Sequence, residues 1–234
     1  MIVSINQPAY LPWLGYFHRI AISDLHVVLD HVQFEKNSYT NRNKVRIATG
    51  STWLTVPLAT SGRFGSLAIN ELEIAVGQPW ATKHWRTLCQ TYGRAPYFKQ
   101  HAPFFEALYG RPWTHLAPMM EEITAYFLQA FGINTRLVFS SKLQSQGGKD
   151  ELVLNLCREV GATTYLSGPL GRDYLRPEAF GEAGIALRYH DFTHPVYPQA
   201  YPGFEPYMAA IDLLFNCGPL SLEVLYQNQP PILK

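Results

Sequence analysis

The hydrophobic positions at the start of the chain predict a strand, a loop, a helix and a second strand. Residues 2–5 form a short apolar run, residues 16–21 repeat apolar positions at helical spacing, and residues 25–29 form another apolar run that ends at Asp30. The loop between the first strand and the helix contains two prolines and Gly15; proline stiffens a loop, and glycine allows a backbone or ligand to approach closely. This order of elements is the opening of a parallel βαβ unit.

The second half of the chain repeats this alternation of strands and helices. Residues 134–140, 163–168 and 185–192 have the apolar character of strands. Residues 150–160 form an amphipathic pattern that ends at Gly161, a typical helix stop. Crossover connections of this kind place the strands parallel in one sheet.

The stretches between these halves follow other patterns. Residues 45–47 and 53–58 flank a glycine turn and predict a hairpin, and residues 67–76 alternate well enough for another strand. From about residue 79 to 131 the spacing is helical, with breaks at glycine and proline. We therefore predict a single α/β domain covering residues 1–234, with a mostly parallel Rossmann-like sheet, flanking helices and a helical insertion at about residues 79–131.

The composition favours a soluble, folded protein. Hydrophobic residues make up 47% of the 234 residues and charged residues only 16%, which allows a large core. The formal net charge of +1 argues against a general affinity for nucleic acid or anionic membranes. No run approaches the length of a membrane-spanning helix, and no basic segment precedes an apolar one at the N-terminus. We expect a cytoplasmic protein with no membrane span and no nucleic-acid partner.

Neither the cysteines nor the histidines indicate a metal site. The three cysteines are far apart and form no Cys-x-x-Cys pair, which argues against a disulfide framework and a cysteine zinc site. His190 and His194 are four residues apart, and four residues of a strand span roughly 13 Å, too far for two ligands of one ion. Helical spacing would bring them together, but Pro195 disfavours a helical backbone at His194. We expect no metal ligands, and the sequence identifies no cofactor.

The loop after the first strand carries side chains suited to binding a substrate. In a βαβ unit this loop lies at the carboxyl edge of the sheet, where α/β proteins bind ligands. The N–H groups at the start of the following helix would also attract an anion. Amides, hydroxyls and an indole are concentrated here, namely Asn6, Gln7, Tyr10, Trp13 and Tyr16. A packed aromatic loop is the competing interpretation, but amides and hydroxyls at the end of a strand favour substrate binding.

Two further segments supply candidate substrate-binding residues. Lys36, Arg42 and Asn43 belong to a polar stretch in which cations alternate with amides, a combination that can hold phosphate or carboxylate. A solvated loop is the alternative for this stretch. His84, in the middle of a predicted helix, is a candidate to face the ligand, and a structural histidine is the alternative there.

The ends of two later strands extend the same site. Ser167 and Gly168 close a predicted strand and are followed by a Gly/Pro loop, which repeats the opening arrangement. Residues 140–142, Ser-Ser-Lys, follow another predicted strand. Because the carboxyl ends of parallel strands meet at one edge of a sheet, we expect both segments to lie beside the first loop, with Ser167 and Gly168 as substrate-binding residues.

The segment after the last predicted strand supplies the catalytic candidates. His194, Tyr197 and Gln199 lie in a proline-containing extended loop, where we expect Tyr197 and Gln199 to bind substrate. His194 is the leading general acid/base, because the unperturbed pKa of histidine is close to working pH. Asp212 lies in an apolar helical run, and a buried carboxylate needs a partner. It either orients the His194 loop in the catalytic site or forms a structural salt bridge.

The opening unit resembles nucleotidyltransferases in which a His-x-Gly-His motif follows the first strand and binds phosphates. Here the comparable tetrad is Trp13-Leu14-Gly15-Tyr16, in which both histidines are replaced. Tryptophan and tyrosine can stack and donate hydrogen bonds, but neither is a cation at neutral pH. The resemblance therefore extends to the topology and does not imply the same phosphate chemistry.

A longer series of motifs resembles the WbqC-like family. The first motifs are Gln7-Pro8-x-Tyr10-Leu11-Pro12-Trp13-x-Gly15-Tyr16-Phe17, Asp30-x-Val32-Gln33-Phe34-x-Lys36 and Asn41-Arg42-Asn43-Lys44. The later ones are Tyr165-Leu166-Ser167-Gly168, His194-Pro195-x-Tyr197-x-Gln199 and Ile211-Asp212-Leu213-Leu214-Phe215-Asn216. Together they cover nearly the whole chain. The family is associated with gene clusters for surface polysaccharide (O-antigen) synthesis, so the resemblance implies that pathway but no particular reaction.

Three functions are open from the sequence. The first is a transferase-type enzyme that acts on a nucleotide-activated sugar or a related phosphate-bearing metabolite, with acyl or aminoacyl transfer as the step. The second is a nucleotidyltransferase-like enzyme, suggested by the opening unit. The third is a non-catalytic binding or assembly protein that uses its many aromatic residues as a partner surface. The sequence specifies neither the oligomeric state nor the group transferred.

Overall fold

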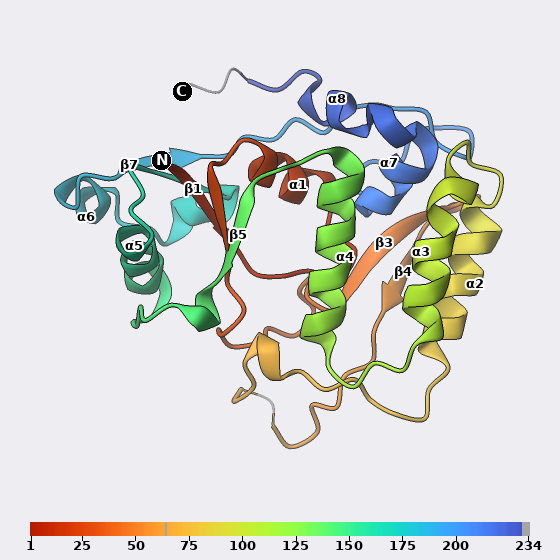
Figure 1. The fold of residues 1–234 in the computed structure, drawn as a ribbon, viewed down its shortest axis with the longest axis horizontal. Coiled ribbons are helices and arrows are strands. Elements are labelled where there is room, and N and C mark those ends of the chain that lie inside the picture. The colour runs from red at the N-terminus through yellow and green to blue at the C-terminus, as the bar shows by residue number, and fades with distance from the viewer. Residues whose placement is uncertain (64, 231–234) are drawn as a thin grey trace.

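The computed structural model describes residues 1–63 and 65–230, and its central element is a five-stranded parallel sheet (Figure 1). The strands are β1 (Ile2–Asn6), β2 (Leu25–Val28), β5 (Arg136–Phe139), β6 (Thr164–Ser167) and β7 (Ala186–Tyr189). Their order across the sheet is β5-β2-β1-β6-β7, and every neighbouring pair is parallel. The α/β class with a mostly parallel Rossmann-like sheet, predicted from the hydrophobic pattern, is therefore confirmed.

Strand β1 lies at the centre of the sheet and is the point where the strand order reverses. On one side Ser4 lies opposite His26 of β2, and on the other it lies opposite Leu166 of β6. The chain first moves outward through β2 to β5, then returns to the other side of β1 and continues through β6 to β7. In open α/β sheets ligands bind outside the carboxyl ends of the strands at such a reversal.

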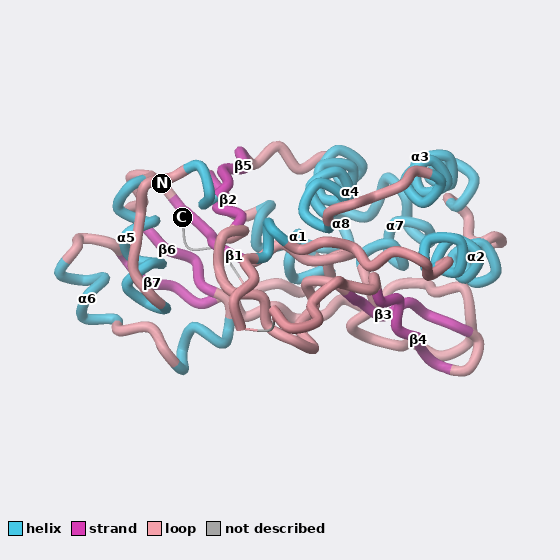
Figure 2. Tube along the Cα trace, turned by 90° about the horizontal axis from the view of Figure 1, so that it is seen from below, coloured by secondary structure: helices cyan, strands magenta, loops and turns pink. Residues whose placement is uncertain are grey.

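The two faces of the sheet pack against different helices because successive residues of a strand point to opposite faces. Val3 and Ile5 of β1 point to a core shared with α5 (Lys149–Glu159) and α6 (Pro177–Glu182). The opposite face lies towards α1 (Leu14–Ala21), α4 (Leu116–Phe131) and α8 (Ser221–Tyr226). Figure 2 shows α5 and α6 on one side of the sheet and α1 and α4 on the other.

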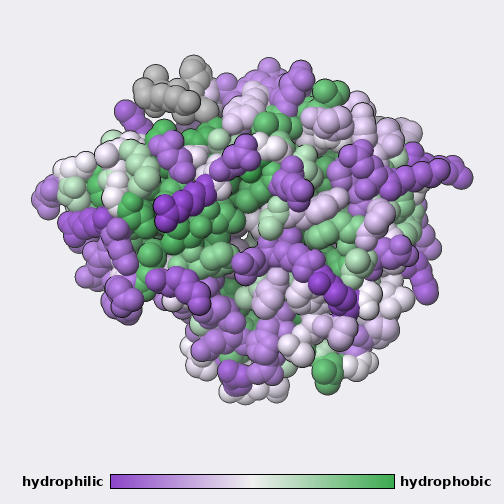
Figure 3. Space-filling model, viewed as in Figure 1, coloured by the Kyte–Doolittle hydropathy of each residue, from purple (hydrophilic) through white to green (hydrophobic). Residues whose placement is uncertain are grey.

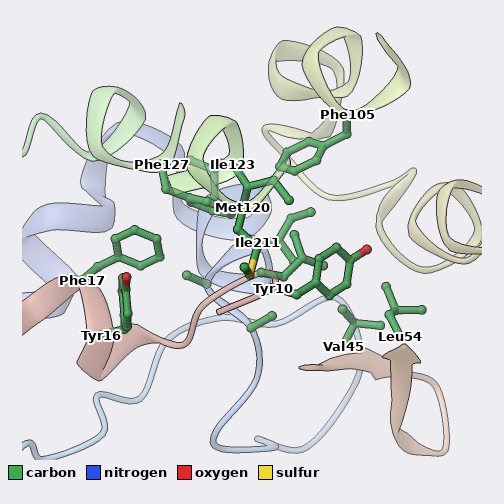
Figure 4. Close-up of a cluster of buried hydrophobic side chains, with 14 of the residues drawn as sticks. Tyr10, Tyr16, Phe17, Val45, Leu54, Phe105, Met120, Ile123, Phe127 and Ile211 are labelled. Atoms are coloured by element: carbon green, nitrogen blue, oxygen red, sulfur yellow. The ribbon is translucent and has the colours of Figure 1, made fainter. Parts of the chain in front are cut away.

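A second core lies beyond α1, where the predicted hairpin and helical insertion pack together. Strands β3 (Arg42–Ile47) and β4 (Gly50–Thr55) form an antiparallel hairpin, and α2 (Trp80–Tyr92), α3 (Phe98–Gly110) and α4 form the insertion. The helix α7 (Ala210–Cys217), buried at every residue, packs among them. Figure 4 shows side chains of the hairpin, of α3 and α4, and of Ile211 gathered around the loop that follows β1.

Two local predictions differ from the structure. Residues 67–76 form a short 3₁₀ turn, η1 (Ile69–Glu71), and the rest of the stretch makes single bridges to several different segments, so no strand forms. Residues 42–44, expected in a loop, are the start of β3 and pair with residues 53–55. Further 3₁₀ turns are η2 (Ser140–Lys142), η3 (Pro169–Asp173) and η4 (Gly218–Leu220). Among the described residues no helix has both the length and the apolar character needed to cross a bilayer.

Candidate functional site

The carboxyl edge of the parallel sheet brings together several segments that the sequence marks as candidates. The strands β1, β2, β5 and β6 end there at Asn6, Val28, Phe139 and Ser167. Asn6 and Gln7 are half-buried at the end of β1, and Gly168 is half-buried at the end of β6, whereas Ser167 is buried. The structure thus places Ser167 and Gly168 at the same sheet edge as the first loop.

A cavity of about 360 Å³ opens at this edge between α4 and the strands β2 and β5. Figure 3 shows a hollow in this region of the surface, beside an apolar patch. The polar lining residues are Tyr16, Asp30, Asn70, His115, Glu121, Thr124, Ser141 and Lys142, and the apolar ones include Val28, Met120, Leu137 and Phe139. An apolar cavity of this size with a few convergent polar groups is typical of a small-molecule site.

The floor of the cavity is fixed by hydrogen bonds between the ends of β2 and β5. Oδ1 of Asp30 accepts from Oγ of Ser140 at 2.9 Å and from the backbone N–H of Ser141 at 2.9 Å. Oδ2 of Asp30 accepts from Oγ of Ser141 at 2.6 Å. Three donors therefore offset the charge of this buried carboxylate. In the described part of the chain, Lys142 beside it is exposed and forms no hydrogen bond or ion pair, which leaves its ammonium group available to an anion.

Tyr16 is the one candidate from the first loop and helix that lines the cavity, and a row of aromatic rings continues from it. Trp13 packs edge-on against Tyr16 with ring centroids 5.6 Å apart, and Tyr39 lies 5.3 Å from Trp13. Trp53 lies 5.8 Å from Tyr39, and the guanidinium of Arg42 lies 4.5 Å above the Trp53 ring. We call Tyr16, Trp13, Tyr39 and Trp53 the aromatic row. Its outer members, Tyr39 and Trp53, are 41% and 43% exposed.

Tyr10 and His84 form a buried structural group away from the cavity. The hydroxyl of Tyr10 lies 2.8 Å from Nδ1 of His84 and 2.5 Å from the hydroxyl of Tyr109. Burial lowers the pKa of His84 to about 4, because the interior disfavours the charged imidazole. Figure 4 shows Tyr10 beside Val45 and Leu54 of the hairpin. This geometry favours a structural role for both residues, and their substrate-binding role stays a prediction.

The candidates near the hairpin hold the first loop in place. Nδ2 of Asn43, which is fully buried, donates to the carbonyl of Leu11 at 2.6 Å, and Leu11 has a positive φ of 47°. An uncommon backbone conformation at a non-glycine residue needs such support from its surroundings. Nη2 of Arg42 donates to the carbonyl of Asn37 at 2.8 Å, and Lys36 lies exposed in the same segment. These residues are not among those that line the cavity.

The proposed catalytic loop forms a separate group around Asp212. This fully buried carboxylate accepts from the hydroxyls of Tyr92 at 2.8 Å and Tyr197 at 2.9 Å, and from Nε2 of Gln199 at 2.9 Å. Burial raises the pKa of Asp212, and these hydrogen bonds act in the opposite direction. Asp212 thus contacts the extended loop through Tyr197 and Gln199.

His194 has both ring nitrogens engaged by the backbone. Nδ1 donates to the carbonyl of Pro195 at 2.9 Å, and Nε2 accepts from the N–H of Tyr207 at 3.1 Å. Burial lowers the pKa of His194. This geometry fixes one neutral tautomer and favours a structural role, and His194 is not among the cavity residues. The catalytic roles of His194 and Asp212 stay predictions, which turnover of His194→Ala would test.

Sequence reasoning did not single out most of the residues that line the cavity. Asn70 lies in η1, His115 directly precedes α4, and Glu121 and Thr124 lie on α4. These segments are far from β2 in sequence, so no local pattern shows that they line a cavity with it. The sequence signals for the cavity were Tyr16, which follows the first loop, and Ser-Ser-Lys at residues 140–142, which was expected at the carboxyl end of a strand and lies there. Among the described residues no group of three histidine, cysteine, aspartate or glutamate side chains is arranged to hold a metal ion.

Comparison with known proteins identifies the family. Residues 7–224 match the WbqC-like protein family, which agrees with the motifs that begin at Gln7. The chain belongs to the WbqC-like family. The uncharacterized protein Rv1507c of Mycobacterium tuberculosis is 36% identical over 218 residues, a match that covers 92% of this chain and 94% of the relative. No solved structure matches this WbqC-like chain.

Proposed function

We propose that this WbqC-like protein is a transferase-type enzyme of surface polysaccharide (O-antigen) biosynthesis. Its substrate is a nucleotide-activated sugar or a related phosphate-bearing metabolite, and the step is acyl or aminoacyl transfer. The observation that carries the proposal is the 360 Å³ cavity at the carboxyl edge of the parallel sheet, lined by Lys142 and Asn70 together with apolar side chains. Membership of the WbqC-like family supports the pathway.

The lining of the cavity fits a polar metabolite that carries negative charge. The ammonium of Lys142 would bind a phosphate oxygen, and the Asn70 amide and Tyr16 hydroxyl would bind sugar or base groups. Leu137 and Phe139 supply apolar contact along one wall. The row of Trp13, Tyr39 and Trp53 would let a longer acceptor stack outside the cavity.

Proton transfer in this proposal falls to the titratable side chains of the cavity wall. Transfer of an acyl group to an amine or hydroxyl requires a base that takes the proton of the attacking group. Glu121 and His115 line the cavity and are exposed. We assign them as the candidates for this role, since the nitrogens of His194 are held by backbone groups.

A binding screen tests the proposal and separates it from its alternatives. We expect nucleotide-sugars to raise the melting temperature of the protein, because a ligand that binds only the folded state stabilises it. Stabilisation only by nucleoside triphosphates in the presence of Mg²⁺ would instead favour a nucleotidyltransferase-like enzyme. No stabilisation by either group would favour a non-catalytic assembly protein and would contradict the proposal.

Two lysine variants localise the binding. Lys142→Met should weaken binding of the stabilising nucleotide-sugar about tenfold or more, because a charge-assisted hydrogen bond contributes about 1.5–3 kcal/mol. Lys99→Met is the matched control, since Lys99 is an exposed residue of α3 that does not line the cavity. Equal affinity of Lys142→Met and Lys99→Met would place the binding site elsewhere.

A further inference from the structure

Arg19 is a buried cation for which no hydrogen-bond acceptor lies among the residues that the structure describes. It lies on α1 with 5% of its surface exposed. Within residues 1–63 and 65–230, no carbonyl or carboxylate accepts a hydrogen bond from its guanidinium, no acidic residue pairs with it, and its Nε is buried without a partner. A charged group in a protein interior is normally paired, because removal of its water shell is costly.

Arg46 is a second buried arginine, and its hydrogen bonds provide a comparison for Arg19. It is also 5% exposed, and its Nε is likewise unpartnered. However, Nη1 of Arg46 donates to the carbonyls of Ile47 and Gly50 at 2.7 Å, and Nη2 donates to the carbonyl of Pro202 at 2.9 Å. Backbone carbonyls thus accept from both terminal nitrogens of Arg46, whereas those of Arg19 have no acceptor in the described part of the chain.

The guanidinium of Arg19 lies at the end of β6, beside the point where the strand order reverses. A Cβ added to Gly168 would collide with Nη1 of Arg19, so glycine at this position makes room for the guanidinium. Gly168 directly follows Ser167, the last residue of β6, and β6 pairs with β1. Gly168 itself is half-buried. Parallel sheets bind ligands at such a position.

The titratable groups around Arg19 are tyrosine hydroxyls and neutral histidine rings. The hydroxyls that interact with its charge belong to Tyr16, Tyr165 and Tyr174, and Tyr174 is 45% exposed. Burial and the nearby Arg19 charge lower the pKa of His190 to about 3, and they act in the same direction on His26. Within the described ranges no carboxylate pairs with this positive charge, and its neighbours are hydroxyls and neutral imidazoles. Such a charge is complementary to an anion.

We propose that Arg19 is an anion-binding residue that holds a phosphoryl group of the ligand at the reversal between β1 and β6. The planar guanidinium fork matches two oxygens of a phosphoryl group. The identity of the ligand as a phosphate-bearing metabolite rests on the proposed function, and the phosphoryl group then supplies the counter-charge that the fold does not. Tyr16, which interacts with Arg19 and also lines the cavity, connects the two parts of the site.

The direct test compares the thermal stability of the wild type and Arg19→Met in inorganic phosphate and in sodium chloride of equal ionic strength. We expect phosphate to raise the melting temperature of the wild type by several degrees more than chloride does, and to have no such effect on Arg19→Met. In chloride, Arg19→Met should be at least as stable as the wild type, because an unpaired buried charge is removed. Arg46→Met should be clearly less stable, since it leaves carbonyls of the hairpin without their donor.

Two further variants keep the test decisive if Arg19→Met does not fold. Arg19→Lys retains the charge without the fork and should bind phosphate about tenfold more weakly. Gly168→Ala, which displaces the guanidinium, should also lose the phosphate effect. The inference is overturned if phosphate and chloride stabilise the wild type equally, or if the phosphate effect survives in Arg19→Met or in both other variants.

The nucleotide-sugar screen separates this inference from the proposed function. If phosphate binds through Arg19 but no nucleotide-sugar binds, the anion site is supported and the proposed substrate is contradicted. If the wild type and Arg19→Met bind a nucleotide-sugar equally well, the proposed substrate is supported and the proposed role of Arg19 is overturned.

Discussion

Two buried charges, Asp212 and Arg19, differ in how the fold accommodates them. Asp212 accepts hydrogen bonds from Tyr92, Tyr197 and Gln199, whereas the fork of Arg19 has no acceptor among the described residues. The first arrangement ties α7 to α2 and to the extended loop before α7. The second leaves a charge that a ligand can neutralise.

Replacing Asp212 tests its structural role. Asp212→Ala should lower the free energy of unfolding by about 2–4 kcal/mol, because two buried hydroxyls and an amide lose their acceptor. Asp212→Asn keeps an acceptor oxygen and should cost less. Urea denaturation followed by tryptophan fluorescence measures both, and a loss below about 0.5 kcal/mol for Asp212→Ala would contradict the structural role.

The difference in free energy of unfolding between the wild type and Asp212→Asn should depend on pH in a defined direction. The folded state raises the pKa of Asp212 above its ordinary value of 3.8, so the folded protein binds this proton more tightly than the unfolded chain does. The stability of the wild type relative to Asp212→Asn should therefore fall as the pH rises from about 3.8 through the raised pKa. A stability difference that increases with pH over this range would show that the hydrogen bonds outweigh burial.

At the residue scale the sequence identified several important side chains but not their roles. An aspartate inside the apolar run at 210–215 signalled a buried partner network, and the structure contains one. Arg19 is likewise a charged residue in the apolar pattern of residues 16–21, but that pattern does not show whether its guanidinium has a partner. Partners such as Tyr92 are more than a hundred residues from Asp212, and no local pattern reveals a contact over that separation.

Among the secondary-structure elements, those with strong local patterns were predicted and the irregular ones were not. The hairpin of β3 and β4 and the helices of the insertion follow the hydrophobic period. Residues 67–76 alternate apolar and polar positions like a strand, but their hydrogen bonds go to several different segments. The alternation of side chains does not show which segments the backbone pairs with.

The contact between α3 and the end of α7 provides a test at this scale. Gly218 has φ 50° and ψ −120°, and a Cβ there would collide with the Tyr97 ring. Gly218→Ala should lower the free energy of unfolding by about 3 kcal/mol or more, from backbone strain plus overpacking.

Gly132 provides the matched control for that substitution. It also has a positive φ, 71°, but a Cβ there would meet no atom within 4 Å. Gly132→Ala should therefore cost only about 1–2 kcal/mol, from backbone strain alone. Equal melting temperatures for the two variants would show that the Tyr97 contact does not constrain the junction of α3 and α7.

For the whole molecule, buried histidines determine the response to acid. Burial lowers the pKa values of His18 and His84 to about 4, and those of His26 and His190 to about 3, from the ordinary 6.5. In this range the unfolded chain binds more protons than the folded protein, so stability falls as the pH decreases from about 6.5 to about 3–4. Each histidine should contribute about 1–2 kcal/mol of this loss between pH 7 and 5.

Urea denaturation at pH 7, 6 and 5 measures this loss. We expect the free energy of unfolding to decrease steadily across the series, with a smaller decrease in His84→Gln than in the wild type. A free energy of unfolding that stays constant between pH 7 and pH 5 would contradict the neutral, buried state of these four histidines.

For the sheet, the sequence predicts parallel strands but not the order of the strands. Parallel strands joined by helices follow from the alternation of apolar runs, but the order β5-β2-β1-β6-β7 depends on pairings such as Ile2 with Thr164 that no local pattern specifies. The carboxyl edge was therefore predicted as a site, whereas the wall supplied by α4 was not.

The most direct test of the account is a crystal structure of the protein with the nucleotide-sugar that stabilises it most. The account predicts that the ligand lies at the carboxyl edge, with its sugar or base beside Asn70 and Tyr16 in the cavity. It also predicts a phosphate oxygen on the ammonium of Lys142 and a phosphoryl group on the guanidinium of Arg19. A ligand bound on the hairpin around Arg42 and Trp53 alone, or in the loop of His194, would contradict it.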